Sequence, residues 1–248
     1  MTSKSQKLSI HCFLEGFSFC KENIITTFSK NDYQNFSALV DEYLPKESAS
    51  SRLIDCICFE YPSVFVPKNY FKKEIALSFI ENYCTPPQSF SYNHQILDSQ
   101  SLVNVFYYRE SINEIKKKEG IELTIEHAWN CVLNYLFQNR QSFKKNQKIV
   151  LLLHKQFFDI FHFQENKFKR ANRFDYENED ELIYYLLCFI EANHIKPSDS
   201  DLIPLGKFNQ YNTCYKKLSE SFKLKYFNDL NNSQQKKDNS HYPWKLFV

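Results

Sequence analysis

The chain has 248 residues, and its 43% hydrophobic and 24% charged residues exclude both a disordered chain and a protein made of apolar membrane spans. A formal net charge of +2 gives no global field for nucleic acid, and 3 glycines are few beside the roughly 17 of an average chain this long. Because loops that bind nucleotide phosphates generally need glycine for close backbone approach, this composition disfavours them.

The first half begins with three strands of period-2 alternation, separated by turns at Glu15-Gly16 and Glu22-Asn23. A helix follows, capped by Asn31 or Asp32 and carrying an apolar stripe at helical spacing. In chain order the predicted elements are strands at 8–14, 17–19 and 24–29, the helix that Pro45 ends, and a strand at 53–59 with a short partner strand at 64–66. They continue with a helix at 68–83, a loop at 85–93, a strand at 103–107, a helix at 109–119 ended by Gly120, and a strand at 123–125 that leads into a helix through Trp129.

The second half repeats the opening order, and Asn178 caps its long helix, with acidic residues in the first turn. In chain order the predicted elements are strands at 148–153, 157–163 and 168–172, a helix from Asn178 through Ile190, a strand at 202–205, a helix at 210–222, a polar loop at 228–240 that we expect to be mobile, and a last strand or helix at 242–248.

Strand–strand–strand–helix therefore occurs twice, beginning near Leu8 and near Ile149. The repeat predicts an α/β fold of two ribonuclease-H-like lobes, each a βββαβα unit, with the architecture of the actin-like ATPase superfamily that includes Hsp70 and the sugar kinases. We place the first lobe at 1–126 and the second at 127–248.

Several segments also resemble a bacterial family, the domain-of-unknown-function family 3822. They are Leu8-Ser9-Ile10, Glu15-Gly16-Phe17-Ser18-Phe19, Val64-Phe65-Val66-Pro67, and Asn172-Arg173-Phe174-Asp175-Tyr176 running into Glu179-Asp180-Glu181-Leu182-Ile183-Tyr184-Tyr185-Leu186-Leu187. The last of these is the most specific, and the resemblance covers nearly the whole chain. It implies an actin-like ATPase fold whose biochemical role is not established.

An actin-like ATPase would hold nucleotide phosphates with a D-x-G-type hairpin in each lobe, where backbone amides bind phosphate oxygens and carboxylates position Mg²⁺. In the first lobe the corresponding hairpin offers Glu15, Gly16 and Ser18. Its spacing departs from D-x-G, and Glu15-Gly16 is also an ordinary hairpin turn, which is the interpretation we favour.

In the second lobe the corresponding hairpin offers His154 and Lys155, without glycine or acid, and Gly206 is the only glycine available for an adenosine contact. His154 lies at the carboxyl end of a strand, where ligands of such sheets often bind, but a lone histidine is more often a structural hydrogen-bonding group. These six residues are our candidates for a binding cleft between the lobes. We expect no ATP hydrolysis, and bound ATP with Mg²⁺ has no motif to support it.

Other chemistries find even less support in the sequence. The first strand has no central acid for two-metal nuclease chemistry, and no G-x-S-x-G elbow is present. Cys56 and Cys58 share a strand face, but no cysteine or histidine lies at zinc-like spacing, so we predict no metal site. We therefore name no catalytic residue.

The location and the partners follow from the remaining patterns. Residues 1–7 are polar, no window approaches the ~18 apolar residues of a membrane span, and eight scattered cysteines without C-x-x-C are typical of a reducing compartment, so we expect a cytoplasmic protein. The basic runs at 116–118 and 144–145 fit helix carboxyl ends better than a phosphate site.

Our first hypothesis is a non-catalytic actin-like module, a pseudoenzyme that binds a protein partner or a small ligand between its lobes. The second is a divergent Mg-ATP-dependent ATPase or small-molecule kinase that uses Glu15, Gly16, Ser18 and Lys155 in an unfamiliar way. A nucleic-acid-associated factor that uses 109–118 and 144–148 is a third, less favoured hypothesis. The sequence does not decide between a monomer and a dimer.

Overall fold

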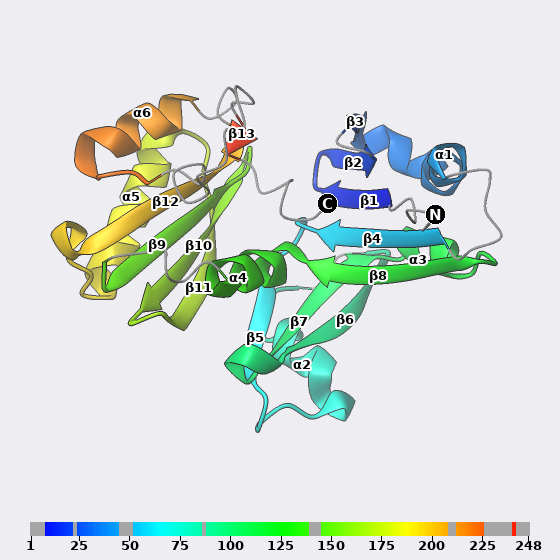
Figure 1. Ribbon diagram of the computed structural model, residues 1–248, viewed down its shortest axis with the longest axis horizontal. Coiled ribbons are helices and arrows are strands. Elements are labelled where there is room, and N and C mark those ends of the chain that lie inside the picture. Colours follow the sequence, from blue (N-terminus) through cyan, green and yellow to red (C-terminus); the bar gives the residue numbers. More distant parts are fainter. Residues whose placement is uncertain are drawn as a thin grey trace, which may run out of the picture. The chain divides into compact units, whose positions relative to one another are not determined.

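Two five-stranded sheets organise the computed structural model of the chain, which describes residues 8–21, 24–44, 52–85, 88–138, 145–207, 212–225 and 240–241 (Figure 1). The described residues divide into two units, one reaching to Leu133 and the other beginning at Asn134. Within these ranges no helix has the length and apolar character needed to cross a membrane.

The sheet of the first unit has the strand order β3-β2-β1-β4-β8. Its strands are β1 (Leu8–Phe13), β2 (Gly16–Lys21), β3 (Ile24–Ser29), β4 (Arg52–Cys58) and β8 (Ile121–His127). The first three form an antiparallel meander, and β4 is parallel to both β1 and β8. This confirms the three opening strands predicted from period-2 alternation.

Helices α1 (Phe36–Tyr43) and α3 (Ser111–Lys116) pack on one face of this sheet through a common apolar core. That core contains Leu8, Ile10 and Cys12 of β1, Phe17 and Phe19 of β2, Phe36 and Val40 of α1, Ile54, Cys56 and Cys58 of β4, and Ile112 and Ile115 of α3. A 3₁₀ segment at Lys30–Asn35 precedes α1, so the α-helix begins later than the predicted cap at Asn31 or Asp32. A final helix, α4 (Ala128–Gln138), follows β8.

A second, three-stranded sheet is inserted in the first unit between β4 and α3. The sheet has the order β5-β7-β6. The inserted segment contains β5 (Ser63–Pro67), α2 (Ala76–Glu81), β6 (Phe90–Leu97) and β7 (Leu102–Arg109). Its small core is built on Val66, Ile80, Val105 and Tyr107.

This insert corrects three predictions. The strand at 64–66 pairs with β7 and not with the strand at 53–59. The helix predicted over 68–83 contains only α2 and the short 3₁₀ turn Lys73–Ile75, because Phe71 packs in the insert core without belonging to a continuous helix. The loop predicted over 85–93 is wrong from Phe90 onward, where β6 begins.

The sheet of the second unit repeats the order of the first, as β11-β10-β9-β12-β13. Its elements are β9 (Gln147–Leu153), β10 (Phe157–Gln164), β11 (Lys167–Asp175), α5 (Glu179–Ala192), β12 (Ser200–Lys207), α6 (Asn212–Ser221) and β13 (Ser240–His241). Strands β9, β10 and β11 are antiparallel neighbours, and β12 is parallel to β9. Helices α5 and α6 cover one face through Leu182, Leu186, Tyr215 and Leu218.

Asn178 caps α5 as predicted, since its side-chain oxygen accepts hydrogen bonds from the amides of Asp180 and Glu181 at 3.0 and 3.1 Å. Each unit thus contains three antiparallel strands, a helix and a fourth strand parallel to the first. This ribonuclease-H-like order, present twice, confirms the predicted duplication. The predicted turn at Glu22-Asn23, residues 228–239 of the polar loop predicted at 228–240, and the last element at 242–248 lie outside the described residues. Ser240, the last residue of that predicted loop, instead begins β13.

Candidate functional site

The two-residue turn of the β1–β2 hairpin consists of Leu14 and Glu15, and Gly16 lies opposite Phe13 as the closing pair. Glu15 is exposed and Gly16 is buried. Gly16 has φ +152°, and a Cβ built on it would lie 2.0 Å from the carbonyl oxygen of Phe28 in β3. The glycine is therefore required by the close approach of β3, which supports the turn interpretation over a phosphate-binding one.

Ser18 is buried and lies opposite His11 of β1. The ring of His11 is hydrogen-bonded through Nε2 to the hydroxyl of Ser9 at 2.9 Å, and burial lowers the pKa of His11 to about 3. The imidazole therefore stays neutral at physiological pH, and Ser18 lies beside an uncharged polar group.

Tyr33, which follows β3, covers the carbonyl groups of the hairpin. Its hydroxyl donates to the carbonyl oxygens of Gly16 and Phe13, at 3.0 and 3.4 Å. The hairpin backbone is thus hydrogen-bonded to a side chain of its own unit.

Beside Tyr33 lies a buried ion pair between Glu60, which follows β4, and Arg109, the last residue of β7. The Arg109 Nε and a carboxylate oxygen of Glu60 are 2.5 Å apart, and the Glu60 side chain is 0% exposed. The Arg109 guanidinium carbon lies 4.0 Å from the centre of the Tyr33 ring and 5.0 Å from that of Phe90. Burial raises the pKa of Glu60 to about 7, although the Arg109 charge acts in the opposite direction.

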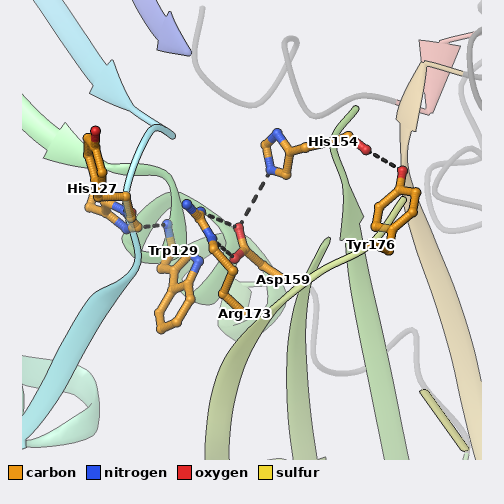
Figure 2. Close-up of polar contacts among 7 residues, drawn as sticks. His127, Trp129, His154, Asp159, Arg173 and Tyr176 are labelled. Atoms are coloured by element: carbon orange, nitrogen blue, oxygen red, sulfur yellow. Dashed lines mark hydrogen bonds and ion pairs between the residues drawn. The ribbon is translucent and has the colours of Figure 1, made fainter. Parts of the chain in front are cut away.

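The β9–β10 hairpin of the second unit has Lys155 and Gln156 as its turn and His154 and Phe157 as its closing pair, since the His154 amide donates to the Phe157 carbonyl at 3.0 Å. Tyr176, which follows β11, donates its hydroxyl to the carbonyl of His154, as Figure 2 shows. Its own amide donates to the carbonyl of Gln156 at 2.9 Å. This hairpin, too, is held by a tyrosine from the segment after the third strand.

The side chains on this hairpin form a buried cluster around Asp159 of β10 (Figure 2). Arg173 of β11 binds both carboxylate oxygens of Asp159, at 2.7 and 2.9 Å. His154 Nε2 lies 3.5 Å from one of these oxygens. Burial alone would raise the pKa of Asp159, but the charge of Arg173 and the hydrogen bond from His154 hold it well below its usual range.

Phe157 lies against this cluster on two sides. Its ring centre is 4.2 Å from that of His154 in a stacked arrangement, and 3.8 Å from the guanidinium carbon of Arg173. In the equivalent hairpin of the first unit, this position of the closing pair belongs to Gly16. The closing pair therefore contains a glycine in the first unit and an aromatic residue in the second.

The predicted site residues are brought together in two groups. Glu15, Gly16 and Ser18 share the first hairpin, and His154 and Lys155 share the second, where Lys155 is exposed and His154 buried. Gly206 lies on the neighbouring strand β12, one residue beyond Leu205, which pairs with Leu152 of β9, and it pairs with His241 of β13. Their role in binding stays a prediction.

The side chains of both hairpins do not fit a Mg-nucleotide. The acidic groups on or beside them include the buried carboxylates of Glu60 and Asp159, each bound by an arginine, and the exposed Glu15 and Asp175, of which Asp175 lies opposite Phe157 on β11. Among the described residues, no three histidine, cysteine or acidic side chains come together in a way that could hold a metal ion. We derive no catalytic step through such a group.

Two smaller features bear on other candidate sites. His127 donates from Nε2 to the Tyr61 carbonyl at 2.8 Å and accepts the Trp129 amide on Nδ1 at 3.2 Å, which fixes its neutral tautomer at the start of α4 (Figure 2).

In the basic run at 116–118, Lys117 pairs with Glu114 at 2.7 Å and Lys118 with Asp41 at 2.6 Å. These lysines are thus engaged within the unit.

The residues that hold the hairpins were not among the site residues predicted from the sequence. They are Tyr33, Glu60, Arg109, Asp159, Arg173 and Tyr176. One signal was present, because the segment Asn172 to Tyr176 stood out as the most specific motif and contains two of them. Its regularity could have pointed to a structural role at the end of β11.

Comparison with known proteins shows one family and one fold. A family model described as "Protein of unknown function (DUF3822)" matches residues 1–224. No curated protein matches the chain. A crystal structure from Bacteroides thetaiotaomicron, described as a protein with actin-like ATPase fold and unknown function, is 18% identical, covers 93% of each chain and superposes with a TM-score of 0.76.

Two other solved structures are more distant. Apo psk41 ParM is 11% identical, with 95% of this chain and 94% of that chain covered and a TM-score of 0.45. The cytoplasmic domain of EpsL, an inner membrane component of the type II secretion system of Vibrio cholerae, is 9% identical, with 81% and 82% covered and a TM-score of 0.44. The fold is that of the actin-like ATPases.

Proposed function

The chain belongs to the DUF3822 family of proteins of unknown function, and we propose that it is a non-catalytic actin-like module that binds a protein partner or a small ligand. The expectation that the ligand lies between the two lobes stays a prediction. The eight cysteines, six of them buried, support work in a reducing compartment, and we place this pseudoenzyme in the bacterial cytoplasm.

The observation that carries the proposal is the closure of both hairpins by side chains of their own lobe. In the second lobe the Phe157 ring, with His154 and Arg173 against it, occupies the position that Gly16 holds in the first. In the first lobe Gly16 lies against the Phe28 carbonyl, and Tyr33 binds the hairpin carbonyls. Both hairpins are thus held in place by side chains of their own lobe, which disfavours the rearrangement needed to bind phosphate oxygens through the backbone.

The buried acids support the same conclusion. A carboxylate that positions Mg²⁺ must be ionised and reachable, whereas Asp159 is 0% exposed and holds a bidentate arginine. Glu60 is equally buried, and its raised pKa means that it is partly protonated at neutral pH. Moving either acid to a ligand would take a carboxylate away from a largely covered arginine, whose side chain is 19% exposed in Arg109 and 8% exposed in Arg173.

A divergent ATPase or small-molecule kinase is the alternative. Glu15 and Lys155 favour it, because both are exposed at the turns of their hairpins and could reach a ligand without disturbing the buried pairs. A nucleotide held in this way would be bound chiefly by side chains and would be sensitive to either charge.

Thermal melts of the full chain with and without millimolar Mg-ATP test the proposal. ATP with a dissociation constant a hundredfold below its concentration would stabilise the fold by about 2.7 kcal/mol. That corresponds to a rise in melting temperature of roughly 5–10 °C. We expect no shift with Mg-ATP, Mg-ADP or Mg-GTP.

A shift of that size, lost in Lys155→Ala or Glu15→Gln and absent when EDTA replaces Mg²⁺, would establish the alternative. Lys196→Ala is a suitable control, because Lys196 is another exposed lysine of the second lobe and lies outside the hairpin. A shift lost in that variant as well would indicate nonspecific binding of the nucleotide.

A further inference from the structure

The third strand of the first lobe, β3, is an edge strand of its sheet and has no charged residue among Ile24, Ile25, Thr26, Thr27, Phe28 and Ser29. Ile24 is 69% exposed and Ile25 is 43% exposed. Neighbouring residues of a strand point to opposite faces, so apolar surface is presented on both faces at this edge. Its pairing with β2 is continuous from Ile24 to Ser29, without a bulge.

The equivalent strand of the second lobe, β11, also lies at the edge of its sheet but carries the features that keep edges from pairing. Lys167, Lys169, Arg170 and Asp175 are exposed along it. Its register with β10 shifts between His162 and Phe163, which places a bulge in the strand. Among the residues that the structure describes, the chain therefore protects one of two equivalent edges and leaves the other unpaired on its outer side.

We propose that β3 pairs with β3 of a second copy of this chain, in an antiparallel dimer related by a twofold axis. A self-paired edge joins two identical patches, and an uncharged strand brings no like charges together when it faces itself. A register centred on Thr26 places Ile24 of one copy opposite Phe28 of the other and Ile25 opposite Thr27. The Ile24–Phe28 contact is a β-branched–aromatic pair of the kind that stabilises sheets.

The length of β3 sets the strength of this association. Six residues on each side bury far less than the ~1,200 Å² of a stable interface, so the dimer forms by a concentration-dependent equilibrium. This inference does not depend on the proposed function, because β3 is not part of the side-chain groups that hold the two hairpins. It is linked to them through Phe28, whose carbonyl lies against Gly16.

Sedimentation velocity of the full chain over a hundredfold range of concentration tests the proposal. We expect the average mass to rise toward that of a dimer, and the double variant Ile25→Lys, Thr27→Lys to remain a monomer at concentrations at least tenfold higher. Both positions are exposed and lie on the same strand face, so the variant sets lysines of the two copies near one another.

Two single variants serve as controls. Ile75→Lys changes an isoleucine of matched exposure, 45%, outside any strand, and Ile96→Lys changes one that is 50% exposed on β6, the edge of the inserted sheet. Both should associate as the wild type does. If the double variant fails to show the far-ultraviolet circular dichroism of the wild type, Ile24→Lys takes its place.

Either of two outcomes would overturn the proposal. If the wild type stays monomeric over the whole concentration range, the chain does not form the proposed dimer. If a dimer persists in the β3 variants, it forms through another surface. Loss of association in Ile96→Lys alone would identify that surface as β6.

Discussion

Tyr176 donates its hydroxyl to the main-chain carbonyl of His154, and Tyr33 makes the corresponding bond to Phe13 in the other lobe. In each lobe the tyrosine follows the third strand and the carbonyl belongs to the first residue of the hairpin closing pair. The duplicated lobes therefore use the same bond to hold their β1–β2 and β9–β10 hairpins.

Tyr176→Phe should lower the stability of the fold by about 1–3 kcal/mol, since the buried His154 carbonyl loses this donor. The midpoint of thermal unfolding measures the loss. Tyr184→Phe is the matched control, because Tyr184 is 62% exposed on α5, and its midpoint should equal that of the wild type. Equal midpoints for all three proteins would mean that the bond contributes nothing.

Asp159→Asn should destabilise the protein by about 3–5 kcal/mol, because it leaves the Arg173 charge buried without its partner. Asp180→Asn removes a carboxylate that is 86% exposed and paired with Lys217, and should change the midpoint little. Since the folded-state pKa of Asp159 lies below its ordinary value, its contribution is present above about pH 4 and is lost as the pH falls. A variant as stable as the wild type at pH 7 would contradict this assignment.

Glu60 should make stability depend on pH in the opposite direction. Its pKa in the folded protein is about 7, above the ordinary value of 4.5, so folding favours the protonated acid. The stabilisation is complete below pH 4.5 and is lost as the pH rises through 7, a change of about 3 kcal/mol.

Glu60→Gln mimics the neutral acid and should not show this dependence. Urea unfolding of the wild type and this variant, at intervals from pH 4.5 to 8, measures the difference. If the difference in stability between the two proteins is the same at every pH, the Arg109 charge keeps Glu60 ionised throughout.

Gly16→Ala should cost roughly 3 kcal/mol or more, because the new Cβ would meet the Phe28 carbonyl at 2.0 Å and the backbone has positive φ. Gly120→Ala is the control, since Gly120 has φ +71° but no atom within 4 Å of the position of a Cβ, and it should cost about 1 kcal/mol. Thermal melts of the two variants give the comparison. A smaller loss for Gly16→Ala would show that β3 moves away from the hairpin easily.

The lobes could be predicted from the sequence because their signals are local. Alternation in 8–14 and the apolar run at 149–153 define central strands, and the Asn178 side chain caps α5 in the structure. The insert was harder, since β6 mixes polar Asn93, His94 and Gln95 with apolar residues and shows no period-2 pattern.

The candidate site was less accessible to sequence reasoning, because its bonds join residues far apart in the chain. Glu60 and Arg109 are 49 positions apart, and Tyr176 and His154 are 22 positions apart. His154 at a strand end resembles a ligand-binding histidine, and only the structure shows that its ring is buried against Phe157 and near Asp159. No local pattern encodes such a pairing.

The Glu60–Arg109 ion pair lies where the chain leaves the first lobe after β4 and where it returns after β7. The segment from Tyr61 to Tyr108 is therefore an insertion whose two ends are held together by this ion pair. Because closure entropy depends only weakly on the length between joined ends, such an insertion can grow, shrink or be exchanged during evolution while the parent sheet keeps its register. The same junction is a natural place at which to graft a foreign domain onto this scaffold.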